Sequence, residues 1–304
     1  MATGLGTFRA SVVRDGPPAP APIERSIRRG EDDYPAALLD LAHPPGVIHV
    51  RGALPPAGAR AVAIVGSRAA TPYGLERAGR LAADLARLGL VIVSGLARGI
   101  DAAAHRCALE AGGVTVAVLP GGLDAITPAT HMGLAQRIAR RGALLSEWPG
   151  AYGVRPGLFV RRNRLIAALS QATVVVEAAE KSGALSTAAV ARRLGRPLLA
   201  VPGDVDRPTS RGCNALLRAG AHFCECAADV VRALPPAATP EPAWSDEARI
   251  AAALGTEPLP AEALAARAGL AIERALGVLL RLEWAGEAVA HPGQRWSRRA
   301  GPLA

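Results

Sequence analysis

The sequence contains few aromatic residues and a single lysine. Aromatic residues make up 3% of the 304 residues, so a hydrophobic core has to be built from alanine, valine, leucine and isoleucine. Because Lys181 is the only lysine, the positive charge is almost entirely arginine. A GC-rich genome would also produce this arginine excess. The formal net charge of +9 nevertheless favours polyanionic partners over acidic ones.

Cysteine is also scarce, and long apolar runs are missing. The four cysteines, of which only Cys224 and Cys226 are close in sequence, do not have the paired spacing of a structural zinc site. We therefore expect reduced thiols and no metal. The N-terminus carries no apolar segment behind a basic start, and no run is long enough to span a bilayer. These features predict a cytoplasmic protein without membrane insertion.

Two common nucleotide-binding motifs are missing as well. No strand-like run is followed by Gly-x-Gly-x-x-Gly, and no Gly-x-x-x-x-Gly-Lys-Ser/Thr occurs. Dinucleotide binding and P-loop triphosphate binding therefore lack their usual sequence support. We expect no cofactor.

The chain divides into four predicted segments. Residues 1–30 are rich in proline and arginine and predict a flexible arm. Residues 31–232 predict a Rossmann-like domain, and residues 233–245 predict a Pro-rich linker. Residues 246–304 contain three helical patterns and a hairpin, which is the outline of a winged-helix domain.

Apolar runs and helical patterns alternate through the second segment. The expected strands are 61–65, 91–93, 114–119, 143–145, 173–176 and 197–201, and the expected helices are 72–88, 101–111, 130–140, 163–169 and 184–194. This rhythm predicts an α/β fold: an extended Rossmann-like, mostly parallel sheet with helices on both faces. Right-handed crossovers bring the carboxyl ends of parallel strands to one edge, where such sheets bind ligands.

Small residues concentrate in the loops that follow these strands. Gly66 and Ser67 precede Arg68, the second loop carries Arg98, and a later loop carries Ser182 and Gly183. Backbone N–H groups of such loops and the helix N-termini beside them attract anions. A single Gly-rich turn is more often plain turn chemistry, but several on one edge favour binding.

The segment Arg161-Arg162-Asn163-Arg164 stands before an apolar helical run. Three guanidiniums and an amide at the beginning of a helix suit a phosphodiester backbone, because guanidiniums bind oxygen atoms in pairs. A solvated basic turn is the structural alternative. We favour binding because the segment is predicted to lie at the same sheet edge as the glycine loops.

These ordered motifs resemble the DprA/Smf family (DNA processing protein A, DNA-protecting protein) over roughly residues 34–230. The motifs that carry the resemblance are Ile64-Val65-Gly66-Ser67-Arg68, Val93-Ser94-Gly95-Leu96-Ala97-Arg98-Gly99-Ile100-Asp101 with His105, Val118-Leu119 to Gly122-Leu123-Asp124, Ser146-Glu147, Phe159 to Arg162-Asn163-Arg164, Val176-Glu177-Ala178, Ser182-Gly183-Ala184-Leu185 with Thr187, Val201-Pro202-Gly203, and Gly212-Cys213-Asn214 to Gly220-Ala221.

The resemblance implies a homodimer that binds single-stranded DNA without catalysis. It also implies a part in loading a RecA-type recombinase during DNA processing, natural transformation and recombination. Carried over by position, Gly66-Ser67-Arg68 would hold backbone phosphate, Arg162, Asn163 and Arg164 would shape and charge the pocket, and Arg155 would contact DNA. The chain departs from the family at Thr127-Pro128-Ala129-Thr130-His131, where relatives usually carry Tyr-Pro and an Asn.

Catalysis has weaker candidates. Asp101 and His105 stand four residues apart, yet a helix N-cap and a buried, hydrogen-bonded histidine explain them better. Glu177 has no second carboxylate near it in sequence, so we expect it to accept hydrogen bonds from loop N–H groups. The alternative function is a Rossmann-like nucleotide phosphoribohydrolase built on Pro120-Gly121-Gly122 and Glu177. A third possibility is an interaction scaffold.

Overall fold

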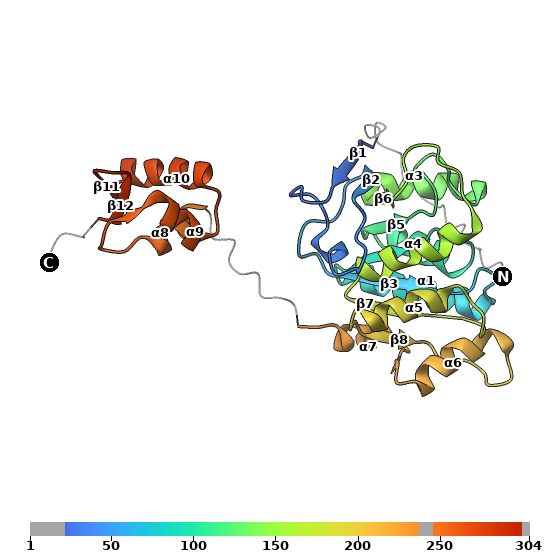
Figure 1. The fold of residues 1–304 in the computed structure, drawn as a ribbon. Coiled ribbons are helices and arrows are strands. Elements are labelled where there is room, and N and C mark those ends of the chain that lie inside the picture. Colours follow the sequence, from blue (N-terminus) through green and yellow to red (C-terminus); the bar gives the residue numbers. More distant parts are fainter. Residues whose placement is uncertain (1–21, 237–245, 300–304) are drawn as a thin grey trace, which may run out of the picture. The chain divides into compact units, whose positions relative to one another are not determined.

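The structure is a computed structural model that describes residues 22–236 and 246–299. The chain forms two compact units that divide after Pro236. Most of the predicted arm and residues 237–245 of the predicted linker lie outside the described residues. Figure 1 shows the helices and strands of both units.

The N-terminal unit is built on a nine-stranded sheet with the order β1-β2-β6-β5-β4-β3-β7-β8-β9. The strands β3 to β9 run parallel, whereas β1 pairs antiparallel with β2 and β2 pairs antiparallel with β6. Their bounds are β1 Glu24–Arg28, β2 Val47–Gly52, β3 Ala61–Val65, β4 Val91–Ser94, β5 Thr115–Val118, β6 Ala143–Ser146, β7 Ala172–Val175, β8 Leu198–Ala200 and β9 His222–Phe223.

Helices cover both faces of this sheet, as predicted. One face packs against α4 and α5 through residues such as Leu165 and Ala188, and the other packs against α1, α2 and α7 through residues such as Leu81 and Ala104. The bounds are η1 Ala36–Leu38, α1 Pro72–Arg87, α2 Ile100–Glu110, η2 Ala129–His131, α3 Met132–Arg141, α4 Pro156–Ala168, α5 Ala184–Arg193, η3 Pro208–Ser210, α6 Arg211–Arg218 and α7 Ala227–Ala233.

The six strands and five helices predicted in this unit are confirmed, and three differences matter. First, Glu24–Arg28 form β1 at the sheet edge, although we assigned them to the arm; only Ile27 of this strand is buried, so no alternating pattern marked it. Second, α4 begins at Pro156 rather than at residue 163. Proline at the first helical position and the extended Arg155 before it define this earlier start. Third, the short strand β9 was not predicted.

The C-terminal unit contains three helices and a three-stranded sheet, which confirms the winged-helix prediction. The elements are α8 Asp246–Ala253, β10 Leu259–Pro260, α9 Ala261–Ala268, α10 Ile272–Trp284, β11 Ala288–His291 and β12 Arg295–Arg298. The helices bury their own core, in which Leu264, Leu279 and Trp296 take part. Among the described residues of both units, no helix is long and apolar enough to cross a membrane and no group of metal-ligating side chains occurs.

Candidate functional site

The order of the strands places a ligand-binding position between β3 and β7. From β3 the chain continues to β4 on one side, while β7 leads to β8 on the other. The loops that leave the carboxyl ends of β3 and β7 therefore diverge and leave a crevice, which is where open α/β sheets bind ligands. The first of these loops carries Gly66, Ser67 and Arg68, and the second runs from Glu177 to Gly183.

Glu177 fixes the first loop in place. Its carboxylate accepts hydrogen bonds from the backbone N–H of Thr71 (3.1 Å) and from the Thr71 hydroxyl (2.5 Å), and its carbonyl accepts from the N–H of Ser67 (2.7 Å). Thr71 in turn caps α1, because its Oγ1 accepts from the N–H of Gly74. The predicted bracing role of Glu177 is confirmed.

The loop after β4 packs tightly against the loop after β3. Gly99 has φ 75°, and a Cβ at this position would lie 2.2 Å from the carbonyl oxygen of Ser67, so only glycine fits. The N–H of Ile100 donates to the same carbonyl at 3.2 Å. This contact sets Arg68 and Arg98 on adjoining turns, as we predicted from the sheet edge.

Asp101 holds the loop of Arg98 from inside. It is 6% exposed, and its carboxylate accepts from the N–H groups of Gly95 (3.2 Å) and Ala97 (3.4 Å). The N-cap of α2 is Gly99, so the prediction that Asp101 caps this helix is wrong. Asp101 is the second residue of α2 and accepts from the preceding loop instead. Burial raises the pKa of its carboxyl group, and the Arg162 guanidinium counteracts this rise.

The early start of α4 decides where its four polar residues point. Because residues 161–164 lie inside the helix and not at its beginning, their side chains leave in different directions. Residues 159 and 162 share one side of the helix, and residues 161 and 164 share another. The prediction of one cluster of guanidiniums at a helix N-terminus is therefore wrong.

Arg162 points under the sheet edge and is 4% exposed. Its Nη1 donates to the carbonyls of Gly95 (2.6 Å) and Val118, which ties α4 to the ends of β4 and β5. Burial lowers the pKa of Arg162 to about 10, and Asp101 raises it in opposition, so the guanidinium stays protonated at neutral pH. A side chain so enclosed positions the loops and has little surface to offer a ligand.

Phe159 occupies the same side of α4 one turn earlier and supports Arg68. The guanidinium carbon of Arg68 stands 4.3 Å from the centroid of the Phe159 ring, in a cation–π arrangement. The sequence places Phe159 in the family motif but does not predict it as a site residue. The three-residue spacing between Phe159 and Arg162 would have placed it at the rim once α4 was started correctly.

The remaining predicted residues lie on the same edge. Arg68, Arg98 and Arg155 are exposed, and within residues 22–236 no carboxylate pairs with them. Asn163 joins α4 to the loop after β7, because its Nδ2 donates to the Gly183 carbonyl at 3.2 Å. The residues that we call the rim are therefore Gly66, Ser67, Arg68, Arg98, Arg155, Phe159, Asn163, Ser182 and Gly183.

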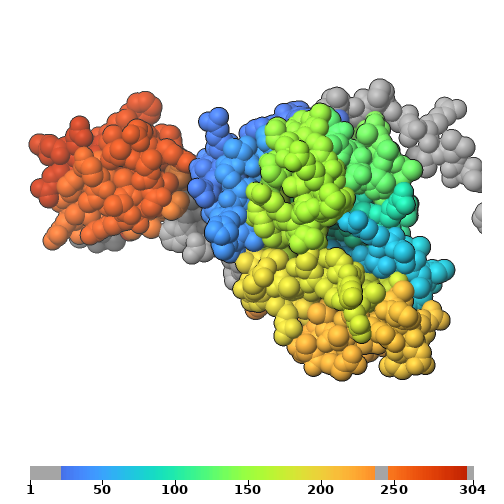
Figure 2. Space-filling view, turned by 45° about the vertical axis from the view of Figure 1, so that its right-hand side comes forward, coloured from blue at the N-terminus to red at the C-terminus, as the bar shows by residue number. Residues whose placement is uncertain are grey.

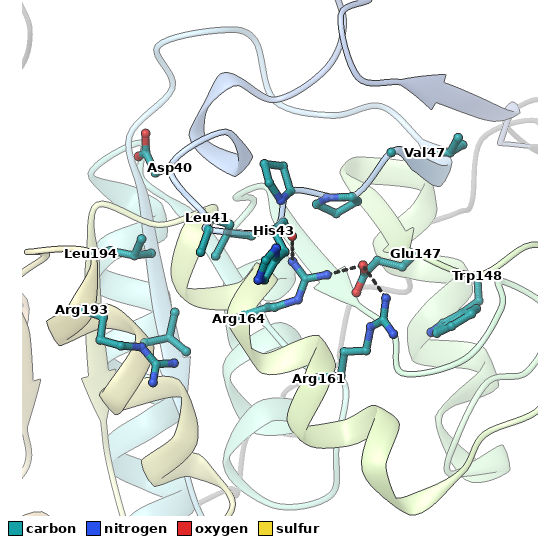
Figure 3. A pocket seen from close by; sticks show the side chains of 15 residues that line it. Asp40, Leu41, His43, Val47, Glu147, Trp148, Arg161, Arg164, Arg193 and Leu194 are labelled. Carbon is teal, nitrogen blue, oxygen red and sulfur yellow. Dashed lines mark hydrogen bonds and ion pairs between the residues drawn. The ribbon is translucent and has the colours of Figure 1, made fainter.

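Arg164 is not part of this rim. Its side chain turns to the other side of α4, where it donates to Glu147 and to the carbonyl of His43 (2.8 Å), as Figure 3 shows. Together with Arg161 and Arg193 it lines a separate pocket of about 820 Å³ between the segment 40–47, α4 and α5. In Figure 2, α4 (yellow-green) is exposed between the N-terminal segment (blue) and the segment of α1 (cyan). Our expectation that Arg164 converges with Arg68 and Arg98 does not hold.

The histidine that resembled a catalytic group has a structural role. His105 is fully buried and its Nδ1 lies 2.7 Å from the hydroxyl of Thr115. Because that hydroxyl donates to the Ile92 carbonyl, it accepts from His105, and Nδ1 carries the proton. Burial and the charge of Arg162 lower the pKa of His105 to about 3. This ring is neutral at physiological pH and does not reach the rim.

The glycines of the loop after β5 are also explained by packing. A Cβ on Gly122 would lie 2.0 Å from the carbonyl oxygen of Gly150, and the N–H of Gly122 donates to the Tyr152 carbonyl at 2.9 Å. The segment 149–152 thus packs directly against this loop.

Comparison with known families agrees with this geometry. A family model described as DNA recombination-mediator protein A matches residues 25–235, and a model of the DprA winged helix domain matches residues 234–294. The chain belongs to the DprA/Smf family.

Relatives in this family differ in length. A putative DNA processing protein DprA from Mycobacterium tuberculosis is 46% identical over 259 residues, which cover 80% of this chain and 65% of that protein. The chain thus spans slightly less than two thirds of that relative. Protein Smf from Escherichia coli is 38% identical over 288 residues, which cover 90% of this chain and 77% of the relative.

Two solved DprA structures share the fold. The X-ray structure of DNA processing protein A from Streptococcus pneumoniae superposes with a TM-score of 0.67 at 36% identity and covers 69% of this chain and 74% of that one. The protein from Helicobacter pylori, whose structure is described as revealing a single-stranded DNA binding mode, gives a TM-score of 0.61 at 32% identity and covers 69% and 94%. The segment 127–131, where we expect a departure from the family, ends at His131, whose Nδ1 lies 2.9 Å from the Leu96 carbonyl beside the rim.

Proposed function

We propose that the protein binds single-stranded DNA along the rim, without catalysis. The observation that carries the proposal is the contact between the Gly66–Arg68 and Gly95–Gly99 loops. It puts Arg68 and Arg98 at one sheet edge, with the Arg68 guanidinium against the ring of Phe159. Guanidiniums bind phosphate oxygens, and an aromatic ring under them offers a surface on which a base stacks. The solved relative from Helicobacter pylori that is described as binding single-stranded DNA supports this reading.

Each rim residue has a role in this proposal. Arg68, Arg98 and Arg155 contact phosphates, Ser67 and Ser182 offer hydroxyl groups, and Gly66 and Gly183 let the ligand come close to the backbone. Asn163 holds the Gly183 loop, and Arg162 holds the loop of Arg98 from below. Arg164, which pairs with Glu147 in the neighbouring pocket, does not contact the same nucleotide.

The family also supports a proposal about the wider function. We infer that the protein assists the loading of a RecA-type recombinase onto single-stranded DNA during DNA processing, natural transformation and recombination. The description of the matching family as a recombination mediator supports this inference. The four free cysteines suit a cytoplasmic location, because thiols persist in a reducing compartment.

A homodimer is part of the same proposal. The strand β9 ends the sheet, and its residue Phe223 is 53% exposed. An open edge with an exposed aromatic side chain is a surface on which a second copy can add its own strand. We propose that two copies associate there.

The experiment measures the binding of a fluorescent oligothymidine at several salt concentrations. A phosphate-gripping rim predicts that the logarithm of the binding constant falls linearly with the logarithm of the salt concentration. Arg68→Ala weakens binding about tenfold, as the loss of roughly 1.4 kcal/mol requires, whereas Arg87→Ala on the exposed end of α1 leaves it unchanged. Equal binding by both variants and the parent contradicts the proposal. Hydrolysis of a nucleoside monophosphate that Glu177→Ala abolishes would support the phosphoribohydrolase instead.

A further inference from the structure

The third helix of the C-terminal unit, α10, exposes an apolar stripe. Trp284 is 86% exposed, the highest value among the large apolar side chains of the residues that the structure describes, and Leu280, four residues earlier, is 48% exposed. Gly277 precedes Trp284 by seven residues. Positions seven apart on a helix lie within about 20° of one line and about 10 Å apart along the axis. The three residues therefore form one stripe, and contiguous exposed apolar surface marks an interaction site.

Within residues 246–299, no neighbouring atom requires a glycine at position 277. A glycine in the middle of a helix makes folding less favourable than an alanine would. A Cβ at Gly277 would meet only Nη1 of Arg281 at 3.8 Å, which is an ordinary van der Waals contact. Neither crowding nor a positive φ explains the residue. The missing side chain leaves a notch on the stripe, and a partner that packs closely there would explain it.

The arginines of α10 do not resemble those of a helix that recognises duplex DNA, because both already have carboxylate partners. Arg274 pairs with Asp246 and Arg281 pairs with Glu247, each at 2.7 Å. Both carboxylates belong to α8 of the same unit. A recognition helix offers its cations and amides to the major groove, whereas here the cations are neutralised and the stripe beside them is apolar. The stripe thus suits a protein surface better than a polyanion.

We propose that this stripe binds the same stripe of a second copy, with the two α10 helices antiparallel. If a two-fold axis passes between positions 280 and 281, residues 277 and 284 are equally distant from it. The ring of each Trp284 then fills the notch at Gly277 of the other copy, in the reciprocal contact that a two-fold axis demands. Leu280 packs beside the axis. The ion pair with Glu247 neutralises Arg281, which the axis brings close to its own counterpart.

This contact is separate from the proposed pairing at β9. A chain with one self-contact in each unit assembles beyond a dimer as its concentration rises, because each contact joins a different pair of copies. If the pairing at β9 does not occur, the contact through α10 gives a dimer by itself. The two proposals therefore fail independently.

The test uses the full chain in a Phe223→Asp background, which removes the exposed aromatic from the β9 edge. Sedimentation velocity over a wide range of protein concentration measures self-association. Trp284→Ala is expected to raise the dissociation constant about 30-fold, the effect typical of a tryptophan at the centre of an interface. Leu88→Ala, which removes an apolar side chain that is 61% exposed in the N-terminal unit, is the matched control and leaves it unchanged.

A substitution at Gly277 tests whether the notch takes part in the contact. Gly277→Gln places a good helix former in α10, so the melting temperature of the C-terminal unit rises while self-association weakens as in Trp284→Ala. If Gly277 had only a structural role, its replacement would not raise the melting temperature and weaken self-association at the same time. Unchanged self-association in Gly277→Gln overturns the packing of Trp284 into the notch.

A cross-link tests the two-fold axis. In a Cys226→Ser background, oxidised glutathione is expected to join two copies of Leu280→Cys through a disulfide, since position 280 lies beside the axis. The exposed Ala266→Cys on α9 serves as the control and stays monomeric on a denaturing gel.

Three results overturn the proposal. Self-association of Trp284→Ala equal to that of its parent is the first. A change in sedimentation coefficient that does not depend on concentration is the second, since it means that the stripe docks within one chain. Weaker oligonucleotide binding with unchanged self-association is the third, because the stripe then contacts nucleic acid.

Discussion

Arginines of the two units stand in opposite electrostatic situations. At the rim, Arg68 and Arg98 have no carboxylate partner within residues 22–236. In the C-terminal unit, Arg274 and Arg281 are held at 2.7 Å by Asp246 and Glu247. The sequence counts these four side chains equally in the net charge of +9. Their potential to bind an anion differs because an intramolecular carboxylate already neutralises the second pair.

A third situation exists below the rim. Arg162 is enclosed, its partners are two backbone carbonyls, and its charge faces the buried carboxyl group of Asp101. The comparison shows that burial and pairing, rather than residue type, determine the role of an arginine. Exposed, unpaired arginines are available to bind an anion, the buried one supports the loops, and the ion-paired ones are neutralised. Each variant below is chosen to break or sharpen that division.

The largest expected effect belongs to the supporting arginine. Arg162→Met leaves Asp101 buried without its opposing charge and frees α4 from β4 and β5, so the free energy of unfolding falls by about 3–5 kcal/mol. Urea denaturation measures it. The neighbouring exposed Arg161→Met serves as the control and changes the value by less than about 0.5 kcal/mol. An unchanged free energy of unfolding in Arg162→Met would mean that this side chain does not hold α4 against the sheet.

A smaller effect tests the buried histidine through pH. His105 has a folded pKa of about 3, below its unfolded value near 6.5, so the unfolded chain binds more protons between these values. Stability is full above pH 6.5 and is lost as the pH falls, by about 2 kcal/mol at pH 5. His105→Gln removes this slope relative to the parent. Parallel stability curves for the two proteins between pH 7 and 5 would show that His105 titrates normally.

The third effect concerns the aromatic platform. Phe159→Ala removes both the ring under Arg68 and the stacking surface, and the affinity for an oligothymidine drops by about 1–2 kcal/mol. Val160→Ala, at a neighbouring residue that is 58% exposed, changes it by less than about twofold. Fluorescence anisotropy measures both variants. If Phe159→Ala binds the oligothymidine as tightly as the parent does, the rim contacts only phosphates and no base stacks on this ring.

Much of the fold could be read from the sequence because buried parallel strands are continuous apolar runs. The runs at 61–65 and 91–93 lie within one residue of β3 and β4. β1 could not be found, since a single buried residue, Ile27, gives no period. β9 has only two residues, both exposed, and its pairing with β8 depends on the tertiary fold.

The positions of site residues were predictable where the loop backbone fixes them. They were not predictable where the direction of a side chain depends on its partner. The glycines of the loops placed Arg68 and Arg98 together. The error at α4 came from starting the helix at the apolar run instead of at Pro156, which rotates every later side chain about the axis. The partner of Arg164 is Glu147, 17 residues away at the end of another strand, and no local pattern reveals that pairing.

One measurement tests the central claim most directly. Arg68→Ala/Arg98→Ala and Arg274→Ala/Arg281→Ala each remove two positive charges from the full chain, and both are compared with the parent for oligothymidine affinity at one salt concentration. The account predicts that the rim variant binds about 100-fold more weakly and that its salt slope falls by about 1.4, whereas the C-terminal variant stays within about twofold of the parent. Equal losses in the two variants would show that net charge alone governs binding and would contradict the account.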